Sequence, residues 1–227
     1  MTGIRALIFD LFFTLIDPLD LAPGQESEYS VLGMDRRDFE ERNAVDYAIR
    51  GCGKIRDPCE MMRHILRGLD VPEPLLRRAA EARVERIRRA IYGVAPKNMA
   101  LLQKLRDRGF KTALISNADV ADIYHWRGSA LSRSFDAAIF SYEVGLLKPD
   151  PRIFRMALER LGTGADQCLY VGDGGHGELR GAKEAGMTTV LTTEYIRRAW
   201  PEKINALRQE ADHVVEGLEE IWDITGS

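Results

Sequence analysis

The chain has 227 residues, of which 32 are basic and 35 acidic, so its formal net charge is -3. Hydrophobic residues make up 45% and charged residues 30% of it, an ordinary composition for a globular protein. The apolar fraction excludes a disordered chain, and the even balance of charge argues against a nucleic-acid or polyanion binder. The length predicts one large domain, or one domain that carries a substantial insertion.

The first apolar run, residues 6–9, has the character of a buried strand that ends at Asp10. Asp17 and Pro18 close the segment, and no small-residue cleavage site follows. The run is far shorter than the ~20 residues that a membrane helix needs. We therefore predict a strand here, no membrane partner and a cytoplasmic location.

From about residue 19 to residue 95 the pattern is helical, without a convincing strand. Apolar residues recur at spacings of three and four in residues 61–69 and again in residues 76–91. We predict a helical cap domain at residues 18–95, inserted into an α/β core made of residues 1–17 and 96–227. The six arginines between Arg77 and Arg89 are interpreted as a solvated face, with the alternative that one or two reach an anionic substrate.

In the rest of the chain, short apolar strands alternate with helices that end at glycines. The predicted strands are residues 111–115, 137–140, 169–171 and 188–191, with a sixth candidate at 213–215. The predicted helices are residues 98–108, 151–161 and 179–185, and a further one begins near Asp119, where Ser116 and Asn117 are candidate N-caps. Such alternation predicts a Rossmann-like parallel sheet with helices on both faces.

Polar residues follow the predicted strands, at the edge where open parallel sheets bind their ligands. A carboxylate at that edge can act as a covalent nucleophile. A second carboxylate beside it is repelled unless a divalent cation or a lysine neutralises the pair, and oxygen ligands of this kind suit Mg²⁺. The residues in question are Asp10 and Thr14, Ser116 and Asn117, Lys148, and Asp173 with Glu178.

Four segments in this order resemble the motifs of the haloacid dehalogenase (HAD) superfamily: residues 9–15 (FDLFFTL), 114–117 (LISN), 148–151 (KPDP) and 171–178 (VGDGGHGE). The resemblance implies that the helical insertion is a C1-type cap and that Asp10 is the nucleophile. It also implies that Ser116, Asn117 and Lys148 hold the transferred group, with Thr14 as a further catalytic residue or only a turn cap. The implied Mg²⁺ ligands are Asp10, the backbone carbonyl of Phe12, and Asp173, with Glu178 behind them.

One position departs from the family pattern. Phosphatases of this superfamily usually carry a second aspartate two residues after the nucleophile, where this chain has Phe12. That aspartate protonates the leaving group, and general acid–base help of this kind is typically worth ~10²–10⁴-fold in rate. Three explanations stay open: a phosphoryl substrate with a good leaving group, carbon–halogen displacement, or a proton supplied by His176 or His64.

We expect a HAD-like hydrolase that uses Mg²⁺ on a small phosphorylated, anionic substrate. The alternatives are a 2-haloacid dehalogenase-type C–X hydrolase and a catalytically weakened binding or regulatory relative. Loops of the cap such as residues 19–31 are expected to set the substrate. We expect a monomer or a homodimer and no nucleic-acid partner.

Overall fold

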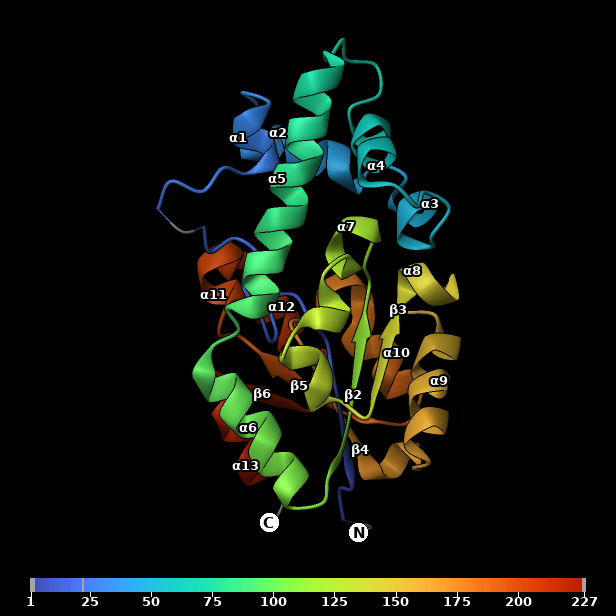
Figure 1. The fold of residues 1–227 in the computed structure, drawn as a ribbon. Helices are drawn as coiled ribbons and strands as arrows, with labels where there is room; N and C mark the ends of the chain where they lie inside the picture. Colours follow the sequence, from blue (N-terminus) through green and yellow to red (C-terminus); the bar gives the residue numbers. More distant parts are fainter. Residues whose placement is uncertain (1–2, 22, 226–227) are drawn as a thin grey trace.

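A six-stranded, wholly parallel sheet forms the centre of the protein, in the order β3-β2-β1-β4-β5-β6 (Figure 1). The computed structural model describes residues 3–21 and 23–225; the outer ends of the predicted core and Ala22 in the predicted substrate loop lie outside this part. The strands are β1 (Ala6–Phe9), β2 (Lys111–Ser116), β3 (Ala137–Phe140), β4 (Cys168–Gly172), β5 (Thr188–Thr192) and β6 (His213–Val215). The predicted Rossmann-like α/β fold is confirmed, including the sixth strand.

Helices cover both faces of the sheet because alternate strand residues point to opposite sides. Leu7 and Phe9 of β1 belong to one apolar cluster, and Ala6 and Ile8 belong to another. Helices α6 (Pro96–Asp107) and α13 (Ile221–Ile224) pack on the first cluster, and α9 (Pro151–Leu161) and α10 (Glu178–Glu184) pack on the second. Helix α8 (Ser141–Val144) follows β3 directly.

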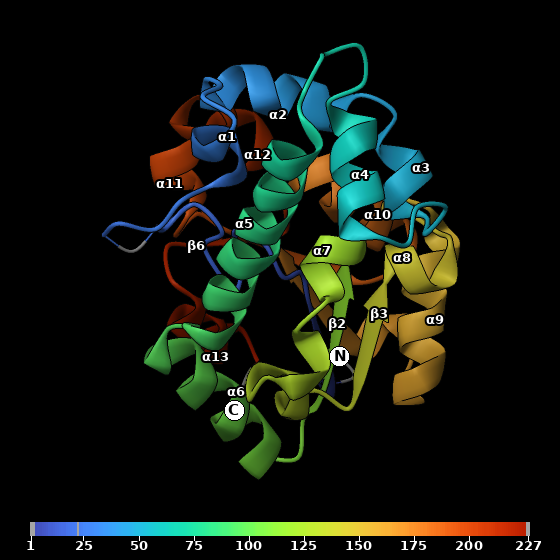
Figure 2. The ribbon, with the colours of Figure 1, turned by 45° about the horizontal axis from the view of Figure 1, so that its top comes forward.

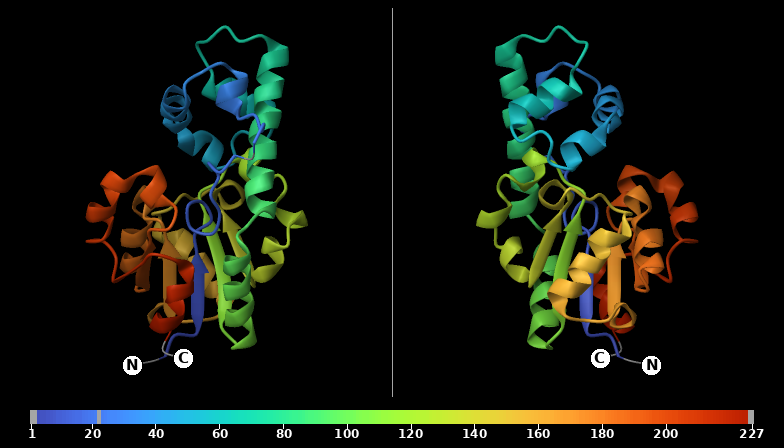
Figure 3. Two further views of the ribbon diagram at one scale, coloured as in Figure 1. Left: turned by 90° about the vertical axis from the view of Figure 1, so that its left-hand side faces the viewer. Right: turned by 90° about the vertical axis from the view of Figure 1, so that its right-hand side faces the viewer.

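In the described part of the chain, the helices between β1 and α6 gather beyond the carboxyl ends of the strands, as Figures 2 and 3 show. They are α1 (Glu28–Val31), α2 (Arg36–Ala44), α3 (Tyr47–Gly51), α4 (Pro58–Ile65) and α5 (Glu73–Tyr92). Their apolar stripes form a separate core with Phe39, Met61 and Leu76, whereas Leu69, placed in a stripe by its spacing, is 39% exposed. The exact limits of this cap, residues 18–95, stay a prediction.

Helix α7 (Val120–Ile123) joins the two parts, because Val120 and Ala121 are buried in the apolar core of the cap although they follow β2. Its N-cap is Asp119, whose side chain accepts a hydrogen bond from the backbone of Ala121. The expectation that Ser116 or Asn117 caps this helix is wrong: both precede the turn in which the helix begins.

Two arginines of α5 are buried, so the interpretation of its arginines as a wholly solvated face is wrong for Arg83 and Arg86. Arg86 donates to both carboxylate oxygens of Glu28, at 2.6 and 2.9 Å, and Arg83 donates to Asp119 at 3.0 Å and to Asp122 at 3.3 Å. The buried carboxylates make this burial possible, since an unpaired charge would be too costly to remove from water.

Between β5 and β6 the chain forms the short helices α11 (Ile196–Ala199) and α12 (Ile204–Leu207), with a 3-10 turn at Pro201–Lys203 between them. In residues 3–21 and 23–225, no helix combines the length and the apolar character that crossing a membrane requires.

Candidate active site

The carboxyl end of β1 places Asp10 at the centre of the sheet edge. Phe9 pairs with Leu114 of β2 and Val171 of β4, and the backbone N–H of Asp10 donates to the Val171 carbonyl at 2.9 Å. The Asp10 side chain is buried, with the residue only 5% exposed. Because β1 pairs with β2 on one side and with β4 on the other, the position of Asp10 is fixed by the strand pairing rather than by a flexible loop.

Lys148 lies against Asp10 from the loop that precedes α9. Its Nζ is 2.5 Å from Asp10 Oδ1 and 2.5 Å from Glu178 Oε2. Asn117 holds the backbone of this lysine with both ends of its amide: Nδ2 donates to the Lys148 carbonyl at 3.2 Å, and Oδ1 accepts from its N–H at 2.8 Å. Asn117, expected to bind substrate, is thus placed to position the lysine.

The two predicted hydroxyl groups are fully buried around Asp10. Thr14 Oγ1 donates to Asp10 Oδ2 at 3.1 Å, so the two oxygens of the nucleophile candidate have different partners. Ser116 Oγ donates to the Asn117 carbonyl at 3.3 Å. Neither Thr14 nor Ser116 is among the described residues that line the adjoining cavity.

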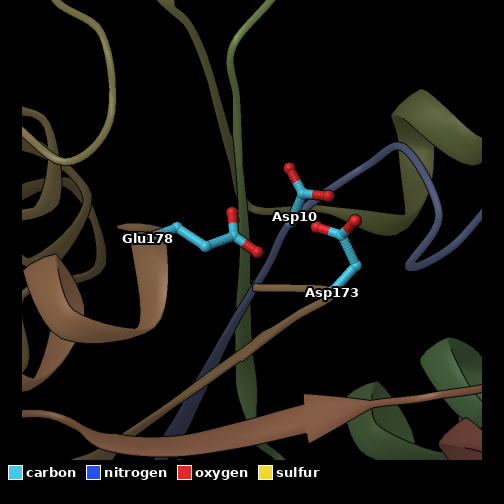
Figure 4. Close-up of side chains that lie close together, drawn as sticks. All are labelled: Asp10, Asp173 and Glu178. Carbon is cyan, nitrogen blue, oxygen red and sulfur yellow. The ribbon is translucent and has the colours of Figure 1, made fainter. Parts of the chain in front are cut away.

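Asp173 and Glu178 approach Asp10 from the end of β4 and the start of α10 (Figure 4). One carboxylate oxygen from each of these three residues lies within 4.8 Å of the others. Glu178 Oε1 accepts from the Gly174 N–H at 3.1 Å, and Asp173 Oδ1 accepts from the Gly175 N–H at 3.0 Å. A Cβ at Gly172 would lie 2.0 Å from Glu178 Oε1, so a side chain at this position would force the glutamate to move.

Burial and mutual repulsion dominate the titration of this cluster. Burial, reinforced by Glu178, raises the pKa of Asp10 to about 6 although Lys148 opposes the shift. Burial, with Glu178 and Asp10, raises the pKa of Asp173 well above its ordinary value. Burial alone would lower the pKa of Lys148, but Asp10 and Glu178 outweigh it and keep that pKa above the ordinary value. The lysine is therefore a permanent cation beside carboxylates that are hard to ionise together.

The cluster fits a divalent cation on its charge and on its donor atoms. Three carboxylates face one ammonium group, which leaves two negative charges uncompensated when all are ionised. Mg²⁺ is bound by oxygen ligands, commonly by one or two carboxylates with water. Asp10, Asp173 and Glu178 supply such oxygens within the span of one ion.

The loop after Asp10 carries the residue that departs from the phosphatase pattern. Phe12 forms an isolated bridge with Ile16, and its half-buried ring packs on the apolar cluster of the sheet. Phe13 adopts a left-handed backbone conformation (φ 57°), and its ring meets the edge of Trp200 at a centroid distance of 4.6 Å. Within the described residues, the backbone hydrogen bonds of this loop use the carbonyls of Leu11 and Ile16 and leave that of Phe12 without a donor.

A cavity of about 820 Å³ opens above Asp10, between the sheet edge and the cap. Asp10, Lys148 and Asp173 lie on its core side. Tyr47, Arg83 and Arg86 contribute from the cap, together with Leu19 and Tyr29 of the predicted substrate loop. Trp200, Lys203 and Leu207 add a third wall from the segment between β5 and β6, which the sequence did not mark as functional.

The two histidines considered as proton donors differ in position. His176 lines the cavity and stacks on Tyr47 of the cap at a centroid distance of 6.1 Å. Desolvation in the cleft and the nearby Lys148 lower the pKa of His176, which favours its neutral form. His64 is not among the described residues that line the cavity; its ring lies 3.4 Å from Arg67. Of the two, only His176 is near the reacting group, and it is a weak source of protons.

Several curated relatives of this chain are phosphatases. It is 37% identical over 134 residues to the phosphoserine phosphatase of Thermus thermophilus, an alignment that covers 58% of this chain and 53% of that protein. The chain spans about half the length of the curated relatives that it matches first. The activities in the names of these relatives are therefore properties of those proteins and do not by themselves carry over to this chain.

Solved structures share the fold at low sequence identity. An L-2-haloacid dehalogenase from Xanthobacter autotrophicus superposes with a TM-score of 0.68 at 20% identity, covering 99% of both chains. A HAD family enzyme from Bacteroides thetaiotaomicron, in complex with magnesium and inorganic phosphate, superposes with a TM-score of 0.62 at 21% identity, covering 84% of this chain and 94% of that one. The haloacid dehalogenase-like hydrolase family matches the sequence over residues 4–186. With the motif residues gathered at one sheet edge, this match shows that the chain belongs to the haloacid dehalogenase-like hydrolase family and is a HAD-type hydrolase.

Proposed function

We propose that the protein is a Mg²⁺-dependent phosphatase that uses Asp10 as a covalent nucleophile on a small phosphorylated substrate. The observation that carries this proposal is the charge of the buried cluster. Asp10 shares its site with Asp173, Glu178 and a single lysine, so the ionised site has two excess negative charges. A divalent cation balances them, whereas a metal-free site would hold part of the cluster protonated.

In the proposed reaction an Asp10 oxygen attacks the phosphorus atom and forms an aspartyl phosphate. The bond from phosphorus to the leaving oxygen breaks, and that oxygen departs with the electron pair. Water then attacks the phosphorus atom, the bond to Asp10 breaks, and inorganic phosphate is released. Thr14 keeps the other Asp10 oxygen in place through the 3.1 Å hydrogen bond.

Lys148 would stabilise the negative charge on the transferred group, since its pKa keeps it protonated. Ser116, whose hydroxyl is held at 3.3 Å by the Asn117 carbonyl, would turn to donate to a phosphoryl oxygen. Asp10, Asp173 and the Phe12 carbonyl would hold Mg²⁺, with Glu178 behind them. When bound, the ion supplies charge neutralisation at the phosphoryl oxygens.

The leaving group would face an apolar surface. Phe12, Phe13 and Trp200 line the cavity beside Asp10, and none of the three has an acidic proton to give. The proposed substrate is therefore one whose leaving group departs without protonation, such as an acyl or aryl phosphate. A cavity of about 820 Å³ has the size of small-molecule sites, which span roughly 300–1,000 Å³.

The test compares the wild-type protein with Asp10→Asn on a panel of phosphate esters, acyl phosphates and 2-haloacids, with Mg²⁺ or with a chelator. We expect the wild-type protein to release phosphate only with Mg²⁺, and Asp10→Asn to release none. Asp107→Asn, which changes an exposed carboxylate on α6 away from the described cavity lining, is the control and should retain full activity. Full activity of Asp10→Asn would refute the assignment of Asp10 as the nucleophile.

A second candidate function is hydrolysis of a carbon–halogen bond. The aromatic surface of Phe12 and Phe13 favours it, because a halide leaves without a proton and sits well in an apolar pocket. In that case the haloacids of the panel would be dechlorinated at the same rate with and without the chelator. Phosphate release that requires Mg²⁺ would exclude this alternative.

A further inference from the structure

Tyr170 lies directly beneath the proposed catalytic cluster, although no motif residue marked it in the sequence. It is on β4, two residues before Gly172, and it is fully buried. Its hydroxyl is 2.7 Å from Glu178 Oε2 and 3.2 Å from Lys148 Nζ. It is not among the described residues that line the cavity, and its hydroxyl faces Lys148 and Glu178 instead.

The protons available around Lys148 define what this hydroxyl does. Four oxygens surround Nζ, namely Asp10 Oδ1, Glu178 Oε2, the Ile115 carbonyl and Tyr170 Oη. An ammonium group has three protons, so these oxygens share them. The tyrosine hydroxyl donates its one proton in a hydrogen bond to Glu178, whose carboxylate can only accept. Its lone pairs accept a hydrogen bond from the ammonium group of Lys148. The hydroxyl therefore links the ammonium group to the carboxylate.

The tyrosine itself is held rigidly. β4 pairs with β1 on one side and β5 on the other, and the ring of Phe154 packs edge-on against the Tyr170 ring at 5.4 Å. Lysine and glutamate side chains have several rotatable bonds. A hydroxyl in a fixed position can therefore restrict where both of these side chains lie. The other oxygen of Glu178, Oε1, lies where a Cβ at Gly172 would be only 2.0 Å away, so a side chain there would displace the carboxylate.

We propose that Tyr170 is a positioning residue that holds the side chains of Lys148 and Glu178 at fixed places beside Asp10. This inference rests on the proposed function of the site. It explains why a polar tyrosine occupies the centre of the sheet, where a phenylalanine would fill the same space. A tyrosine that served packing alone would leave its hydroxyl without consequence for turnover.

The test uses Tyr170→Phe, which keeps the ring and removes the hydroxyl. Losing a hydrogen-bond partner behind a ligand or catalytic group typically costs about 10–100-fold in metal affinity or activity. We expect kcat to fall by about that factor, with KM changed much less, because the cavity wall is untouched. Mg²⁺ affinity, measured by calorimetry, should fall as well, because Glu178 loses its donor.

Thr112→Val is the matched control. Thr112 is also a buried hydroxyl in the sheet, but it donates to the Ser134 carbonyl, at the amino end of β2. The control should lose comparable stability and keep kcat, KM and Mg²⁺ affinity. Unchanged kcat and Mg²⁺ affinity in Tyr170→Phe would overturn the proposal, as would an equal loss of kcat in both variants.

Two further measurements keep this test separate from the test of the proposed function. If the wild-type protein shows no phosphatase activity, the proposed function fails, and crystal structures of wild type and Tyr170→Phe decide the positioning role. A displacement of Lys148 Nζ or the Glu178 carboxylate by about 1 Å, enough to cost ~10²-fold in a working site, supports it, and superposable side chains refute it. If Tyr170→Phe does not fold, Tyr170→Met, which also lacks the hydroxyl, takes its place with the same expected results.

Discussion

Replacing Lys148 by methionine tests the charge balance on which the account of the site depends. The lysine is 4% exposed, and its Nζ lies 2.5 Å from a carboxylate oxygen of Asp10 and 2.5 Å from one of Glu178. Methionine fills a similar volume without a charge. The variant therefore leaves the buried carboxylates of Asp10 and Glu178, and the half-buried one of Asp173, with no cation among the described residues that contact them directly.

The magnitude follows from these distances. At 2.5 Å and an effective dielectric constant of 20, each ion pair contributes about 6–7 kcal/mol of Coulomb attraction. The cost of burying the lysine offsets most of this, and breaking a buried pair by removing one partner destabilises proteins by about 3–5 kcal/mol. We expect Lys148→Met to lose about that much unfolding free energy at pH 8 without Mg²⁺.

The loss should depend on pH. Burial already raises the pKa of Asp10 to about 6, and removing the lysine raises it further. A carboxyl group whose pKa is higher in the folded state contributes no penalty when the pH is low enough to protonate it, and its full penalty appears above its folded-state pKa. The difference between variant and wild type should therefore be large at pH 8 and small at pH 5.

Urea denaturation at both pH values, with and without Mg²⁺, measures these effects. Mg²⁺ at about 100 times its Kd should raise the unfolding free energy by about 2.7 kcal/mol. Lys183→Met is the control: this lysine pairs with Asp212 at a half-exposed site and should cost about 0–1 kcal/mol at either pH. A loss in Lys148→Met that matches the control, or that is the same at pH 5 and pH 8, would refute the reasoning.

Two further predictions address the leaving group and the cap. In Phe12→Asp, a proton donor returns beside the leaving group, so turnover of alkyl phosphates should rise by up to ~10²–10⁴-fold while aryl phosphates gain little; equal gains for both classes, or none, in a steady-state assay would contradict this. In Glu28→Gln, buried Arg86 loses its charged partner, and unfolding free energy should fall by about 3 kcal/mol at neutral pH. Arg86 keeps the pKa of Glu28 below its ordinary value, although burial opposes this shift. The loss of unfolding free energy relative to wild type should therefore be complete above the ordinary pKa of glutamate and shrink as the pH falls below it. A loss that does not depend on pH would contradict the pairing.

The sheet and the polar residues at its edge were predictable from the sequence because both follow from local pattern. Buried parallel strands are short uninterrupted apolar runs, and the residue after each run lies at the carboxyl edge. Asp10 after β1 and Asp173 after β4 were located in this way, and the structure brings them together with Glu178 and Lys148.

Contacts between distant segments were not predictable in the same way. Arg83 and Arg86 sit among exposed arginines on α5, and only the three-dimensional position of Glu28 and Asp119 explains their burial. Trp200 and Lys203 join the cavity from a segment with no motif. Spacing along one helix carries no information on carboxylates that lie elsewhere in the chain.

Tyr170 illustrates a second limit. It fits an apolar strand pattern as well as phenylalanine does, and its hydroxyl matters only through Lys148 and Glu178, which are distant in sequence or on another element. A useful signal was present nonetheless: a tyrosine in a strand buried on both faces needs a hydrogen-bond partner.

Trapping the phosphoryl group on Asp10 tests the central claim most directly. Acid quench of a single turnover with an acyl or aryl phosphate and Mg²⁺, followed by mass analysis of the peptide that contains residues 3–17, reports whether this aspartate becomes phosphorylated. We predict a phosphoryl adduct on Asp10 that is absent with a chelator and in Asp10→Asn. Turnover with no adduct on Asp10, or with the adduct on another residue, would contradict the account.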